Sequence, residues 1–77
     1  MQLTVHIAET IRSVIKNIPK TVVTEKQRSI TLRQLSVEIG IPPILIVFAV
    51  VNGVKKSLDE DITGDADIHF FGTMSGG

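Results

Sequence analysis

The chain has 77 residues, which is enough for one small domain and too few for a second, because a chain of this size buries only about 60% of its unfolded surface. Lysine and arginine (8) balance aspartate and glutamate (8), so the sequence lacks the basic surface that nucleic-acid binding requires. Cysteine is absent, which excludes disulfides, thiolate metal sites and thiol nucleophiles.

The sequence shows neither the pattern of a signal peptide nor that of a membrane helix. The start of the chain, MQLTVHIAET, alternates apolar and polar residues and does not have the form of a signal peptide. The longest apolar run, residues 44–51, is much shorter than the roughly 20 residues of a membrane helix. We therefore expect a cytoplasmic protein with no membrane partner.

The first part of the chain predicts a strand, a short helix and a second strand. Leu3, Val5 and Ile7 alternate with polar residues, as in a strand with one solvated face. In residues 9–18 the apolar residues recur at positions i, i+3, i+4 and i+7, which predicts a short amphipathic helix. Residues 21–25, TVVTE, have the composition of a strand.

The principal helix is predicted to begin at Leu32. Thr31 stands at the N-cap position, and Gln34 three residues later completes a capping box. Gly40 is suited to the left-handed conformation that ends a helix, and the prolines at positions 42–43 prevent its continuation. We expect a helix of about two turns.

A hairpin follows the helix. Residues 46–51 are apolar without alternation, which predicts a central strand covered on both faces. Asn52 and Gly53 form the dipeptide of a type I′ turn, and VKKSL, residues 54–58, is the expected return strand.

The last predicted strand, residues 67–71, places Ile68 and Phe70 on one face and Phe71 on the other. The order of elements predicts an α+β two-layer domain, with a mixed sheet of about five strands, one principal helix and a short extra helix. We expect the globular domain to cover residues 1–71 and residues 72–77 to form a flexible C-terminal tail.

His6 and His69 are the only imidazoles in the sequence, and both are predicted to point away from the core. Neither has a cysteine, or a carboxylate at a ligand-like spacing, to act as a second ligand. We therefore expect ordinary surface or interface histidines, with no metal site and no catalytic role.

Five acidic residues crowd the approach to the last strand: Asp59, Glu60, Asp61, Asp65 and Asp67. A calcium loop would need acids at alternate positions followed by a distal glutamate, and that pattern is missing. The acids predict either a solvated loop or an electrostatic docking surface for a basic partner.

The sequence contains no nucleophile elbow, no phosphate-binding glycine loop and no dinucleotide fingerprint, so we expect neither an enzyme nor a cofactor. The chain ends in Gly76 and Gly77. Two glycines at the end would occur by chance in about 0.5% of chains, given a glycine frequency of roughly 7%. A cloning remnant or a frayed terminus is the alternative to a functional tail.

The segments TLRQL, VFAVVNG and ITGDADIHFF, together with the final SGG, resemble the ubiquitin-like sulfur-carrier proteins. This is the family of the molybdopterin synthase small subunit and the thiamine sulfur carrier. The likeness covers nearly the whole chain, and its most specific parts are AVVNG and the terminal glycines. It implies a β-grasp fold, with the first and last strands side by side in the middle of the sheet. The short first helix and the chain length look closer to the molybdopterin branch.

The resemblance also implies a function, that of a carrier rather than an enzyme. A ubiquitin-activating-type enzyme would use ATP to adenylate the carboxylate of Gly77, beside Gly76, and the adenylate would become a thiocarboxylate. The sulfur would pass to a sulfur-accepting synthase subunit, in molybdopterin, tungstopterin or thiamine biosynthesis. Bare glycines suit a tail that threads a narrow cleft, because a Cβ would clash there.

The candidate partner-binding residues are Phe71, Gly72, Thr73, Met74 and Ser75. Phe71 is either an aromatic anchor for the partner or part of a second small core beneath the first helix. Two other functions stay open. One is a ubiquitin-like modifier conjugated through Gly77 to substrate lysines, and the other is a β-grasp interaction module with an idle tail.

Overall fold

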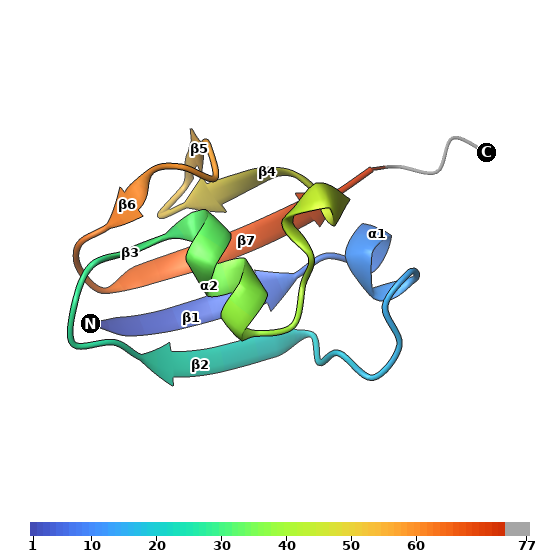
Figure 1. Ribbon diagram of the computed structural model, residues 1–77, viewed down its shortest axis with the longest axis horizontal. Helices are drawn as coiled ribbons and strands as arrows, with labels where there is room; N and C mark the ends of the chain where they lie inside the picture. Colours follow the sequence, from blue (N-terminus) through green and yellow to red (C-terminus); the bar gives the residue numbers. More distant parts are fainter. Residues whose placement is uncertain (74–77) are drawn as a thin grey trace.

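The computed structural model describes residues 1–73, in which helix α2 lies across one face of a five-stranded mixed sheet (Figure 1). The elements in chain order are β1 (Gln2–Ile7), α1 (Glu9–Arg12), β2 (Thr21–Glu25), β3 (Ile30–Thr31), α2 (Leu32–Glu38), the 3₁₀ helix η1 (Pro43–Leu45), β4 (Ile46–Val51), β5 (Val54–Lys56), β6 (Asp61–Ile62) and β7 (Ala66–Gly72). Within residues 1–73, no helix is long and apolar enough to cross a membrane.

The sheet has the strand order β2-β1-β7-β4-β5. Its two central strands, β1 and β7, are parallel, with Val5 opposite Ile68 and His6 opposite His69. The other neighbouring pairs are antiparallel. The first and last strands therefore lie side by side in the middle of the sheet, which confirms the predicted α+β fold of β-grasp type.

The hydrophobic core fills the space between the sheet and α2. Leu3 and Val5 of β1, Ile68 and Phe70 of β7, and Leu35 of α2 are all fully buried. Each such side chain contributes about 1.5–3 kcal/mol when it leaves water. The predicted core face of the last strand is thus confirmed.

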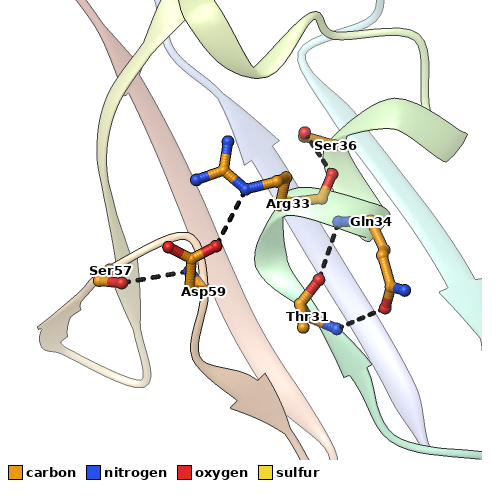
Figure 2. Close-up of polar contacts among 6 residues, drawn as sticks. All are labelled: Thr31, Arg33, Gln34, Ser36, Ser57 and Asp59. Atoms are coloured by element: carbon orange, nitrogen blue, oxygen red, sulfur yellow. Dashed lines mark hydrogen bonds and ion pairs between the residues drawn. The ribbon is translucent and has the colours of Figure 1, made fainter.

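Helix α2 begins at the predicted residue because its N-terminal amides find acceptors. The Thr31 hydroxyl accepts a hydrogen bond from the Gln34 amide at 3.1 Å, and the Gln34 side-chain oxygen accepts one from the Thr31 amide at 3.1 Å (Figure 2). This is the predicted capping box. At the other end, Gly40 takes the expected left-handed conformation with φ +95°.

The loop before β6 completes the cap of α2. The amides of Leu32 and Arg33 donate to the carbonyl oxygens of Glu60 and Leu58, at 3.2 and 2.9 Å. The Arg33 side chain also pairs with Asp59 at 3.0 Å (Figure 2). The short strands β3 and β6, which the sequence did not predict, pair antiparallel beside this contact. The helix start is therefore anchored by residues almost thirty positions away.

The helix after β1 is shorter than predicted. It covers Glu9–Arg12 instead of residues 9–18, and Asn17 lies in the left-handed region at φ 69°. Ile11 is buried, but Val14 is 63% exposed. Ile15 and Ile18 pack against the core in part, but from irregular backbone. The β-branched side chains lower helix propensity, so the helix does not continue for a second turn.

Strand β4 has the predicted bounds, but the prediction that both its faces are covered is wrong. Ile46 and Ala49 are buried, whereas Val47 is 60% exposed and Phe48 is half-buried. Because β4 is next to the edge strand β5 and α2 covers only one face, apolar side chains of β4 face solvent.

The hairpin turn is confirmed, since Asn52 and Gly53 both have positive φ, at 50° and 84°. The return strand β5 is shorter than predicted, ending at Lys56. The 3₁₀ helix η1, which the sequence did not predict, precedes β4. Strand β7 extends one residue beyond the prediction at each end, so that it includes Gly72.

Candidate functional site

Strand β7 ends at Gly72, which packs between α1 and η1. The Gly72 amide donates a hydrogen bond to the Thr10 hydroxyl at 2.9 Å. A Cβ at position 72 would lie 2.9 Å from Cγ1 of Ile11 and 3.0 Å from the carbonyl oxygen of Leu45. Glycine is therefore required here for space, and the point where the chain leaves the sheet is fixed to the domain.

The sheet face opposite α2, which we call the open face, carries a cluster of aromatic side chains. Phe71 stacks on Phe48, its neighbour in the register, with ring centroids 5.0 Å apart. His69 stacks 6.2 Å from Phe71, and the Lys55 ammonium lies 4.9 Å from the centre of the Phe48 ring. Phe71 thus lies on the sheet face opposite to that of the core residue Phe70, as predicted. It packs on Phe48 instead of filling a second core beneath α1.

A shallow groove lies beside this cluster, where β1 and β7 end. It has a volume of about 340 Å³, and its lining includes His6, Lys20, His69 and Phe71. Exposed aromatic surface with a charged rim is typical of protein docking sites. The open face therefore offers an interaction surface next to the exit of the chain.

The two histidines form a second feature of the open face. The rings of His6 and His69 stack with centroids 4.3 Å apart. Asp67 contacts both, with Oδ1 2.7 Å from Nε2 of His6 and Oδ2 3.1 Å from Nε2 of His69. The hydrogen bond with His6 is the main cause that lowers the pKa of the Asp67 carboxyl group, with the His69 contact adding to it.

Comparison with known proteins identifies the fold. No model of a known protein family matches the chain, and no curated protein sequence does. Among solved structures, that of SAMP1 from Haloferax volcanii matches with a TM-score of 0.68, over 100% of both chains, at 18% sequence identity. The chain has the ubiquitin-like β-grasp fold. At this identity the likeness shows the fold alone.

In this ubiquitin-like domain, Gly72 belongs to the folded body, so the predicted boundary between domain and tail moves past this residue. Thr73, the next predicted partner-binding residue, is exposed. The predictions for Met74, Ser75, Gly76 and Gly77 lie outside the described residues.

The parallel central strands correct the expectation that neither histidine has a second ligand within reach. The oxygen and nitrogen ligand atoms of His6, Asp67 and His69 lie within 4.8 Å of one another. The sequence contained a signal for this, since VHI in β1 and IHF in β7 have the same apolar-His-apolar pattern. Parallel pairing in register places the central residues of the two patterns side by side.

Three of the other acidic residues before β7 contact groups of the domain. Asp59 pairs with Arg33, and Asp65 accepts a hydrogen bond from the Gln2 amide at 2.7 Å. Glu60 accepts a hydrogen bond from the Ser57 amide at 2.8 Å. These contacts favour the solvated-loop interpretation over a docking surface for a basic partner, because the three side chains brace the loop against the domain.

Proposed function

We propose that this ubiquitin-like domain is a sulfur carrier whose reactive group is the C-terminal carboxylate of Gly77. The observation that supports this most directly is the anchored end of β7. Gly72 is held by Thr10 between α1 and η1, and the exposed Thr73 follows at once. A fully extended chain of residues 73–77 spans up to roughly 17 Å. A terminal carboxylate on such a segment reaches into the active site of a partner.

The chemistry requires activation of that carboxylate, because it is an anion at neutral pH and resists nucleophiles. A Gly77 oxygen attacks the α-phosphorus of ATP, the bond to pyrophosphate breaks, and an acyl adenylate forms. Hydrosulfide then adds to the acyl carbon, and the bond to AMP breaks. The products are a thiocarboxylate, AMP and a proton. Gly76 and Gly77 add no Cβ that would obstruct entry into a narrow cleft.

The proposed partners are an activating enzyme of the ubiquitin-activating type and a sulfur-accepting synthase subunit. Both would bind the open face, where Phe71 and Phe48 offer an aromatic anchor beside the groove. The domain itself is a co-substrate and not an enzyme. We place the reaction in the cytoplasm, in cofactor biosynthesis of the molybdopterin, tungstopterin or thiamine type.

The test uses the full chain, ATP, sulfide and each ubiquitin-activating-type enzyme encoded in the same genome. Pyrophosphate release and replacement of one oxygen by sulfur in the intact mass are the expected results. A chain amidated at Gly77 is the matched control, and it should give neither signal. If no candidate enzyme forms an adenylate, the proposal is overturned.

A second experiment, in cell lysate, separates the carrier from a modifier. A substrate lysine that attacks the adenylate would form an amide bond and release AMP, giving a species of higher mass. Conjugates in cell lysate that disappear when residues 76–77 are deleted, without any thiocarboxylate, would replace the sulfur-carrier proposal with that of a ubiquitin-like modifier.

A further inference from the structure

His6, Asp67 and His69 share one face of two adjacent central strands. His6 of β1 and His69 of β7 are direct partners in the parallel register, and their rings stack at an interplanar angle of 17°. Asp67 precedes His69 by two residues, so that it lies on the same face. Because β1 and β7 are the middle of the sheet, the backbone positions of all three residues are fixed on both sides.

The imidazole nitrogens converge on one carboxylate. Nε2 of His6 lies 2.7 Å from Asp67 Oδ1, and Nε2 of His69 lies 3.1 Å from Oδ2. The three groups therefore already meet through the atoms that coordinate metals, within 4.8 Å of one another. Imidazole nitrogen binds zinc at about 2.0–2.1 Å and carboxylate oxygen at about 2.0–2.2 Å. Binding of one ion requires side-chain rotations that bring the three atoms to these distances from it.

We propose that His6, Asp67 and His69 bind one divalent transition-metal ion, such as Zn²⁺, on the open face. Two imidazoles and one carboxylate suit zinc, copper, nickel and cobalt, whereas magnesium and calcium prefer all-oxygen sites. The ion takes the place of the hydrogens between the imidazole Nε2 atoms and Asp67, so each ring binds it as a neutral imidazole through Nε2, with its remaining proton on Nδ1.

The exposure of the site leaves room for a further ligand. The side chains of His6, Asp67 and His69 are 35%, 53% and 41% exposed. Three protein ligands leave a fourth tetrahedral position for water or for a group of another molecule. The groove lined by His6 and His69 lies beside this position, so the ion is open to exchange with solvent. This inference does not depend on the proposed sulfur chemistry, because it concerns the isolated chain.

The test is calorimetric titration of the full, untagged chain with zinc chloride, because an added polyhistidine tag would bind zinc itself. The chain has only 2 histidines, so imidazole ¹H–¹⁵N spectra report both rings without ambiguity. We expect saturable binding of one ion, with shifts of both imidazoles. Magnesium chloride at the same concentration should give no signal.

The variants are His6→Gln, His69→Gln and Asp67→Asn, each first checked for a native amide spectrum. Each should weaken zinc binding by about tenfold or more, since even changes behind the ligands cost 10–100-fold. Glu25→Gln is the matched control and should bind like the parent, because Glu25 lies on the same face but pairs with Gln2, at the far end of β1 from His6.

Several results would overturn the proposal. They are the absence of saturable binding, zinc affinity that His6→Gln or His69→Gln leaves unchanged, and equal binding of zinc by the parent and by Asp67→Asn. The last result would leave a pair of histidines without the carboxylate, which is not the site proposed. Because all three side chains are partly exposed, a loss of fold in all the variants is not expected.

Discussion

Glycine is required at position 72 for space and not for backbone conformation, since its φ lies outside the left-handed region that favours glycine. The nearest atoms to a Cβ at this position belong to Ile11 and to the backbone of Leu45. A backbone carbonyl cannot rotate away as a side chain can. A side chain at position 72 would therefore push β7 away from α1 and η1.

Gly72→Ala should lower the free energy of unfolding by about 1–3 kcal/mol, the usual cost of overpacking. In a domain of this size, that corresponds to a fall in Tm of roughly 4–8 °C per kcal/mol. Thermal unfolding followed by circular dichroism measures it. Gly64→Ala is the control and should change Tm little, because nothing lies within 4 Å of a Cβ at that position. Equal effects of the two substitutions would contradict the packing argument.

Asp67 gives a prediction about acid stability. Its folded-state pKa is lowered, mainly by the hydrogen bond with His6, so ionised Asp67 favours the folded state. This contribution is complete above the unfolded-state pKa of about 3.9 and is lost as pH falls through the lower folded-state pKa. Asp67→Asn has no carboxyl group at this position, so its stability does not fall through protonation there.

Urea unfolding between about pH 5 and pH 2, with a chelator present, measures the difference between parent and Asp67→Asn. The parent should lose more stability than the variant as the pH falls through this window. Parallel stability curves for the two proteins would show that the pKa of Asp67 is the same in both states.

At the scale of elements, α2 shows how local and distant contacts combine. Thr31 and Gln34 cap the helix from within. The amides of the two residues between them donate to carbonyl groups of a distant loop, those of Leu58 and Glu60. The helix has only 7 residues, too few for stability on its own, so both sets of contacts matter.

Thr31→Ala should destabilise the domain by about 0.5–2 kcal/mol, because the Gln34 amide loses its acceptor. Thr31→Ser keeps a hydroxyl group at the same position and is the matched control, expected to retain most of the stability. Chemical denaturation of the three proteins measures the effect. A serine variant as unstable as the alanine variant would assign the loss to the missing methyl group and not to the cap.

Elements with local signals were predicted well from the sequence. The capping box and Gly40 gave the start and end of α2, and Asn52 with Gly53 gave the hairpin turn. The small β3–β6 pair was missed because it depends on contacts between distant residues. The extent of α1 was wrong because apolar spacing alone does not report the low helix propensity of β-branched residues. The apolar composition of β4 predicted cover on both faces, but composition alone does not distinguish a core from an exposed docking surface.

At the scale of the whole molecule, the candidate sites arise from strand pairing. The sequence placed Phe71 on the face opposite the core and left open whether it is a partner anchor or part of a second small core. Phe48 became its partner through the antiparallel register of β4 and β7. Likewise, His6 and His69 meet because β1 and β7 are parallel. Strand order is not fixed by periodicity, so the VHI and IHF patterns predict the histidine pair only when β1 and β7 are known to be parallel neighbours in register.

Phe71→Ala should weaken the complex with the activating enzyme by about 30-fold or more, as for an aromatic hot spot of roughly 2 kcal/mol. The loss of stability should stay below the ~3–5 kcal/mol of a fully buried phenylalanine, because Phe71 is half-buried. Val37→Ala, at a 61% exposed position on α2, is the control and should bind normally. Calorimetry below the Tm of both variants measures the affinities, and equal affinities would remove the open face from the proposed interface.

The last prediction separates folding from reactivity. Deletion of residues 76–77 should leave the thermal unfolding curve unchanged, because glycine has no side chain to bury. The same deletion should abolish adenylation, because the new terminal carboxylate on Ser75 would stop short of the ATP by about 7 Å, the length of two extended residues.

A chain in which two alanines replace Gly76 and Gly77 has the parent length and is the control for the reach of the terminal carboxylate. If that variant folds normally but is activated poorly, the partner's cleft requires glycine itself. If the deleted chain is still adenylated, activation does not depend on the terminal glycines, and the proposed carrier role loses its chemical basis.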